Sequence, residues 1–210
     1  GAVKMTFNSQ VGINTVANTV DVLSADQFRT LVNEIGTDAQ KAKLGTANTN
    51  WQDMVLQDAI ITSTNLSISN SGEKSTTYLN LGYTNQEGVL KNDNFKRYLV
   101  RVNEEIRFNK NIKIGGDITG YYFQNNPPAA SVTNALWAAP IAPVQFDEKT
   151  YYSMPSFQRA QVGNPMAALN RNDRNSVEDG YRVIGSIFAE IKFKQYFTWR
   201  STVYGDFGFN

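Results

Sequence analysis

Apolar and polar residues alternate along several stretches of about ten residues, which is the repeat expected of a β-strand. In the first stretch the odd positions from Val3 to Ile13 are mostly apolar, and the even positions from Lys4 to Asn14 are polar or glycine. The alternation recurs in residues 65–69, 78–83, 98–108, 112–122, 181–193 and 197–209. The pattern therefore predicts seven strands, each with one apolar and one polar face.

The links between these segments differ in length in a regular way. Short links at residues 72–75, 109–111 and 194–196 alternate with longer links at 17–60, about 85–94 and about 124–179. Outer-membrane barrels have this arrangement, with tight turns facing the periplasm and long loops facing outside. We therefore expect an all-β fold, a partial transmembrane antiparallel β-barrel of about seven strands with long extracellular loops.

Aromatic residues lie near both ends of the expected strands. Those beside the short turns are Phe108, Phe193 and Phe197, and those toward the long loops are Tyr83, Tyr98, Tyr122, Tyr181 and Phe207. Two aromatic girdles around an apolar band are typical of barrels that span a bilayer. Single-chain bacterial barrels have an even number of strands, at least about eight, so seven strands do not close. We expect these residues alone not to fold into a stable monomer, because two open strand edges would remain.

The period of two also assigns faces. The residues expected to face a polar lumen are Lys4, Asn8, Asn80, Arg101, Asp117 and Thr119. Those expected to face lipid are Val100, Ile114, Val183 and Val203. Glu104 is an exception, because it falls on the apolar face, where a β-bulge, a protein-covered patch or an interfacial position would accommodate it.

Helix signals occur in the first long loop. Ser24 reads as an N-cap with Gln27 three residues later, and apolar residues recur at helical spacing before Gly36. A second short helix is expected after Asn50, so the loop 17–60 should contain one or two short helices. The loop 124–179 carries all six prolines and is expected to be irregular and extracellular. These prolines are Pro127, Pro128, Pro140, Pro143, Pro155 and Pro165.

Composition excludes several kinds of chemistry. The chain has no Cys and no His, which removes Ser-His-Asp and Cys-His catalysis and most transition-metal sites. We predict no enzyme activity, no cofactor and no metal site. The net charge of +1 provides no basic field for nucleic acid. The longest apolar run, residues 135–144, is too short and too interrupted by proline for a spanning helix.

Few side chains suggest a binding site. Adjacent carboxylates at 104–105 and 147–148 are not a catalytic pair, because neighbouring strand residues point to opposite faces. The Asn- and Asp-rich run 170–179 lacks the regular ligand spacing of a calcium loop, so we expect turn capping there. Flat aromatic side chains in the long third loop could stack on a sugar or a peptide, or pack against other loops or a partner. The candidate contact residues are Trp137, Tyr151, Tyr152 and Phe157.

Several segments in order resemble SusC/RagA-type TonB-linked outer-membrane transporters. They are DVLSADQFRTLVNE at 21–34, NTNWQDM at 48–54, NLSISNSGEKSTTYLNLGYTNQEG at 65–88, FKRYLVRVN at 95–103 and NPMAALN at 164–170. In that family these segments follow the plug domain and form the first barrel strands. The resemblance thus implies that residues 1–210 are the N-terminal part of such a barrel, without the plug.

The resemblance also implies a function. Transporters of this type import oligosaccharides or peptides across the outer membrane of Gram-negative bacteria with energy from TonB, which contacts a segment not seen in this sequence. A SusD-like surface lipoprotein caps the barrel, and lipid surrounds it. Another outer-membrane receptor or a passive porin would show the same alternation, and a soluble all-β binding protein is a more distant alternative.

Overall fold

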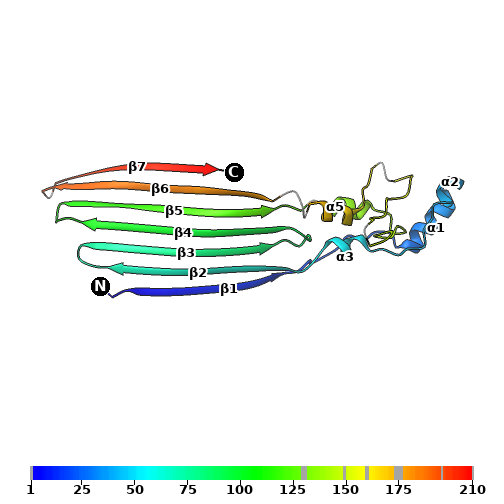
Figure 1. The fold of residues 1–210 in the computed structure, drawn as a ribbon, viewed down its shortest axis with the longest axis horizontal. Helices are drawn as coiled ribbons and strands as arrows, with labels where there is room; N and C mark the ends of the chain where they lie inside the picture. Colours follow the sequence, from blue (N-terminus) through cyan, green and yellow to red (C-terminus); the bar gives the residue numbers. More distant parts are fainter. Residues whose placement is uncertain are drawn as a thin grey trace.

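Seven antiparallel strands form one sheet in the order of the sequence, from β1 to β7. The structure is a computed structural model that describes residues 2–128, 132–148, 150–158, 161–172, 177–194 and 196–209. The strands are β1 (Lys4–Asn14), β2 (Ala59–Ser71), β3 (Ser75–Glu87), β4 (Asn94–Arg107), β5 (Ile112–Asn126), β6 (Glu178–Phe193) and β7 (Phe197–Phe209). They lie in a single layer with the short turns at one end (Figure 1). This is the predicted unclosed piece of a barrel.

The strand register keeps most apolar and polar residues on separate faces of the sheet. Val100 lies opposite Leu81 on one side and Gly120 on the other, whereas Arg101 lies opposite Asn80 and Thr119. Residues directly opposite each other share a face. Following these pairs through all seven strands places the six predicted polar-face residues together and the four predicted apolar-face residues on the other side. The predicted division of faces is confirmed.

The link between β3 and β4 is shorter than the sequence predicts. It spans residues 88–93, because β3 and β4 extend beyond the alternating segments, as β2 also does. Thr62 and Thr64 occupy apolar-face positions in β2, so the alternation is not visible there. The Gly88 N–H donates to the Asp93 carbonyl at 2.9 Å and closes the link. Burial raises the pKa of the Asp93 carboxyl above its ordinary value.

Short helices occur in both long loops. The described helices are α1 (Ala25–Ile35), α2 (Asp38–Lys41), α3 (Trp51–Val55), α4 (Val132–Trp137) and α5 (Pro165–Asn172). The capping box of Ser24 and Gln27 begins α1, and Asn50 caps α3, as predicted. None of the described helices is long and apolar enough to cross a membrane.

The prediction of an irregular third loop is only partly right, because two short helices, α4 and α5, interrupt its described irregular segments. At α5 the Asn164 Oδ1 atom accepts hydrogen bonds from the N–H groups of Met166 and Ala167. Pro165 then takes the first helical position, where its missing N–H has no consequence. One proline thus starts a helix rather than preventing it.

Almost all buried side chains lie in the loops and not in the sheet. We call the described parts of residues 15–58, 88–93 and 127–177 the loop head, which lies beyond the strand ends in Figure 1. One cluster in it contains Trp51, Val55, Ala135, Ala138, Ala142, Met154, Val162 and Leu169. A second contains Ala25, Ala139 and Ile141, with Phe28 packed against it. The first and third loops therefore share one core.

Candidate functional site

The sheet presents two chemically different surfaces, which we call the polar face and the apolar face. The polar face carries residues such as Asn8, Asn80, Arg101 and Asp117, and the apolar face carries Val100 and its row neighbours. Large apolar side chains on the apolar face are exposed in this chain, among them Ile118, Ile187 and Val203. A sheet with an uncovered apolar face requires an apolar environment on that side.

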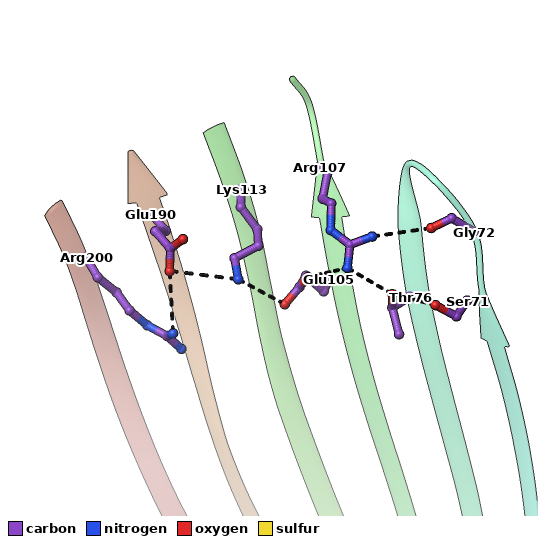
Figure 2. A network of polar contacts seen from close by, with 8 residues as sticks. All are labelled: Ser71, Gly72, Thr76, Glu105, Arg107, Lys113, Glu190 and Arg200. Carbon is purple, nitrogen blue, oxygen red and sulfur yellow. Dashed lines mark hydrogen bonds and ion pairs between the residues drawn. The ribbon is translucent and has the colours of Figure 1, made fainter. Parts of the chain in front are cut away.

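A row of charged side chains crosses the polar face beside the short turns (Figure 2). Glu105 of β4 lies 2.9 Å from Arg107 and 3.3 Å from Lys113 of β5. Glu190 of β6 lies 3.8 Å from Lys113 and 3.7 Å from Arg200 of β7. Cations and carboxylates thus alternate across four strands. We call this row the charge ladder.

The charge ladder extends to the turn between β2 and β3. Arg107 donates to the Gly72 carbonyl and to Thr76 Oγ1, and Ser71 and Thr76 share a hydrogen bond of 3.4 Å (Figure 2). At the other end the Arg200 guanidinium lies 3.9 Å from the centre of the Phe188 ring, within the range of a cation–π contact. The ladder consequently connects all three hairpins at the turn end of the sheet.

Ion pairing continues farther along the polar face. Arg182 of β6 makes two hydrogen bonds to the Asp206 carboxylate of β7, at 2.8 and 2.6 Å. Ser186 donates to Asp117 Oδ1 at 2.5 Å. Bidentate guanidinium–carboxylate pairs are geometrically specific. The Arg182–Asp206 pair thus joins β6 to β7, and the Ser186–Asp117 hydrogen bond joins β6 to β5.

A hollow of about 240 Å³ interrupts the polar face between β2 and β5. Its lining residues are Asn65, Tyr78, Asn80, Gly82, Thr84, Arg97, Leu99, Arg101 and Thr119. All of these occupy polar-face positions in the register. Gly82 lies between Asn65 and Leu99, and its missing side chain leaves the space open.

Four tyrosines form a continuous row on the apolar face, at the level nearest the loop head. The ring centres are 5.0 Å apart for Tyr83 and Tyr98, 6.3 Å for Tyr98 and Tyr122, and 4.8 Å for Tyr122 and Tyr181. The register places Phe209 beside Tyr181, one row beyond the predicted Phe207. The predicted aromatic row is therefore present. We call it the tyrosine row.

Aromatic side chains also border the short turns. Phe193 and Phe197 pack with ring centres 5.6 Å apart at the turn between β6 and β7, and Phe108 is exposed beside the next turn. From Tyr181 to Phe193 the strand covers roughly 40 Å at about 3.3 Å per residue. A tilt of about 40° reduces this to roughly 30 Å. That height matches the hydrocarbon thickness of a bilayer.

Glu104 remains the exception on the apolar face. It lies opposite Thr77 and Gly116 in an unbroken register, so the β-bulge, one of the three alternatives considered for it, is absent there. Asn70 pairs with Thr77 in the same row, and its Oδ1 atom is buried without a hydrogen-bond partner. The row lies close to the short turns. An interfacial or protein-covered position remains the expectation for Glu104, whereas Glu105 faces the other side as predicted.

The loop head contains a second hollow, of about 890 Å³, between the segment 19–28, the segment 48–52 and the segment 135–140. Val20, Val22 and Leu23 are exposed there. Gln52 holds the extended segment by bonding both the N–H and the carbonyl of Val20. Exposed apolar side chains therefore border the hollow, and the hydrogen bonds of Gln52 fix the segment that carries them.

The four candidate contact residues take different positions in the loop head. Trp137 lines the large hollow, and its side chain is exposed. Tyr152 is half-buried against the head core and stacks on Phe146 at 5.7 Å. Tyr151 and Phe157 are also half-buried and do not line the large hollow. The structure thus leaves Trp137 as the most available of the four and does not bring them into one site.

Sequence reasoning missed Asn164, which organises the third loop. Its Nδ2 atom donates to the carbonyls of Val144 and Tyr152, while its Oδ1 atom caps α5. The Asn-Pro pair at 164–165 is an N-cap signal that would have identified the start of the helix. Trp51, by contrast, starts the predicted helix after Asn50 and is buried in the head core.

Metal binding has no support in the part of the chain that the structure describes. No group of three or more Asp and Glu side chains lies together there in a way that could hold an ion. The run 170–179 includes residues 173–176, which lie outside the described residues. Turn capping in that run therefore remains a prediction.

Comparison with known proteins identifies similar chains. No family model matches. Residues covering 91% of this chain are 30% identical to the TonB-dependent receptor SusC of Bacteroides thetaiotaomicron, over 21% of that protein. The TonB-dependent receptor P26 of Formosa agariphila is 26% identical over 76% of this chain and 16% of its own length. The chain thus spans about a fifth of the length of these relatives.

Solved structures show the same fold. The RagAB peptide importer in its closed-closed state has a TM-score of 0.76 and 19% identity, and the match covers 99% of this chain and 28% of that chain. The open-open state of the same importer has a TM-score of 0.74 and 16% identity over the same shares. At this identity the similarity establishes the fold.

Proposed function

The chain belongs to the SusC/RagA-type family of TonB-dependent receptors, and we propose that it forms part of the barrel wall through which such a receptor imports large nutrients across the outer membrane of a Gram-negative bacterium. The observation that carries the proposal is the division of faces. Seven strands keep most charged and amide side chains on one side and an exposed apolar band, bounded by aromatic rows, on the other. Barrels that enclose an aqueous path in a bilayer need this division.

This function determines which face of the sheet points to the barrel interior and which points to the membrane. The polar face, with the charge ladder and the hollow, lines the aqueous interior, and the apolar face contacts lipid. The tyrosine row marks the outer membrane–water boundary, and the charge ladder lies near the periplasmic turns. The loop head projects outside the cell, where it meets imported molecules first.

We assign the loop head a role in contact with the cargo or with a SusD-like surface lipoprotein. The exposed Trp137 on the border of the large hollow supports contact at this position. Similarity to a peptide importer supports peptides as cargo, and the likeness to SusC-type receptors leaves oligosaccharides as the other class. Energy would come from TonB acting on a segment of the complete receptor.

A passive porin is the second candidate, because it has the same two-faced wall. The experiment that separates the two uses the complete receptor in cells and labelled peptides and oligosaccharides too large for general porins. Uptake through a TonB-dependent receptor should fall to background when the proton-motive force is dissipated or TonB is removed. Uptake that continues unchanged would support the porin and contradict our proposal. A small sugar that enters through other channels is the control.

A further inference from the structure

Two arginines in the polar-face hollow have no acidic partner in the described chain. Arg107, Lys113, Arg182 and Arg200 on the same face each lie within 4.0 Å of a carboxylate. For Arg97 and Arg101 no such pair is found among the described residues, although both line the hollow. The other described arginines of the sheet thus have carboxylate partners, whereas the two arginines in the hollow have none among the described residues.

Asn80 and Tyr78, which line the hollow, bond to Ser67 of β2 and not to the arginines. Asn80 donates to Ser67 Oγ at 2.9 Å, and the Tyr78 hydroxyl lies 3.3 Å from the same oxygen. Arg101 uses its Nε in a long contact of 3.4 Å with Asn103 Oδ1. That contact orients the guanidinium and leaves its terminal nitrogens available. A ligand would thus meet unoccupied, positively charged donors.

The backbone supplies room for both guanidinium groups to reach one ligand. Arg97 and Arg101 are four residues apart on the same face of β4, which separates their Cα atoms by roughly 13 Å. Leu99 and Gly82 lie side by side between them. A Cβ at position 82 would lie 3.0 Å from Asn65 Oδ1, so any larger side chain would begin to fill the floor of the hollow.

We propose that Arg97 and Arg101 form a binding site for a carboxylate group on the inner wall of the barrel. Arginine matches a carboxylate with two parallel N–H donors, and such charge-assisted bonds are stronger than neutral ones. The two arginines could both donate hydrogen bonds to one carboxylate, or each could bind one of two carboxylates on an extended chain. The carboxylate belongs either to imported cargo or to another segment of the complete receptor. The inference rests on the proposed function in one respect, namely that the polar face lines the interior of the barrel.

The first arm of the test measures equilibrium binding to the purified complete receptor in detergent. The probes are a peptide with two glutamates and the same peptide with glutamines in their place. Wild-type receptor should bind the glutamate peptide at least tenfold more tightly, and the double variant Arg97→Gln with Arg101→Gln should bind both equally. Lysine variants at both positions should keep part of the preference, because they retain charge without the planar fork. Lys4→Gln, which removes a polar-face cation on β1, should keep the full preference.

The second arm identifies a carboxylate of the receptor itself. If an internal segment occupies the arginines, the two peptides should bind alike, but the double glutamine variant should unfold at a lower temperature than wild type and Lys4→Gln should not. Either result supports the site and names the source of the carboxylate. No peptide preference together with unchanged thermal unfolding would overturn the proposal. Neither arm depends on TonB, so failure of energised uptake would count against the proposed function alone.

Discussion

The indole N–H of Trp51, in the first long loop, donates a hydrogen bond of 3.0 Å to the carbonyl of Ala139, in the third. Both residues are buried. Trp51→Phe keeps an aromatic ring in the core and removes one of two donors to this carbonyl, which still accepts from the Ala142 N–H at 3.1 Å. The loss of one hydrogen bond should cost about 1 kcal/mol. We expect faster amide hydrogen exchange in segment 135–142 of the complete receptor, with unchanged exchange in β4 and β5. Trp199→Phe, at an exposed position on β7, is the control and should change neither region.

Asn164 offers a test of the third loop. Asn164→Ala removes the cap of α5 and the Asn164 donor to the Tyr152 carbonyl. The Val144 carbonyl loses one donor and keeps the Tyr152 N–H at 3.1 Å. Loss of the cap alone should cost about 1 kcal/mol, and loss of the donor to the Tyr152 carbonyl should add to this cost. Limited proteolysis should cut the variant faster between residues 144 and 169. Asn48→Ala, an exposed asparagine of the first loop, should leave cleavage at the wild-type rate, and equal rates in both variants would contradict the assigned role of Asn164.

Trp137 tests the role of the loop head in uptake. Because this ring is exposed, Trp137→Ala should leave the receptor folded and assembled while reducing cargo uptake or lipoprotein association several-fold. Tyr152→Ala should act differently, by loosening the head through loss of the stacking on Phe146. A broader test deletes residues 130–157, which should leave barrel assembly largely intact and impair uptake or association. Wild-type levels of both after the deletion would show that the loop has no such role.

Adjacent residues on β7 test the division of faces. Val203 lies on the apolar face and Thr202 on the polar face. An arginine at a lipid-facing position near the bilayer midplane costs about 2–4 kcal/mol, so Val203→Arg should lower the urea midpoint of the receptor in vesicles. Thr202→Arg should lower it far less. The reverse order would mean that the faces are exchanged.

The neighbouring glutamates of β4 test the charge ladder. Glu105→Gln leaves Arg107 and Lys113 close together without the carboxylate between them. We expect a loss of stability of up to about 1 kcal/mol that shrinks as salt screens the cations. Glu104→Gln, on the opposite face, removes a charge that has no ion pair among the described residues and should not destabilise. Unfolding midpoints at low and high salt compare the two variants.

The sequence predicted the sheet well because a period of two is local information. Val100 and Arg101 take opposite faces whatever the pairing partner, and short turns determine which strands are neighbours. The contact between Trp51 and Ala139 has no such local signal, since it joins residues from two separate loops. The faces were therefore predictable residue by residue, whereas the shared core of the loop head was not.

The candidate contact residues show the same limit. Trp137 and Tyr152 look equivalent in the sequence, as aromatic residues in a proline-rich loop. Only the packing distinguishes them, because Tyr152 is held by Phe146 and Asn164 while Trp137 remains exposed. Arg97 was similarly missed as a site residue, since a missing carboxylate partner becomes visible only when the strand register is known.

The shared core of the loop head has a mechanical consequence. The first loop leaves the sheet between β1 and β2, and the third leaves it between β5 and β6, so the shared core joins two pairs of strand ends that β3 and β4 separate in the sheet. This shared core should resist separation of the strands at the loop-head end of the sheet and have no effect at the end with the short turns. A force applied to the third loop from outside would consequently act on the first loop as well as on β5 and β6. Single-molecule force measurements should record rupture of the head as an event before the hairpins unzip.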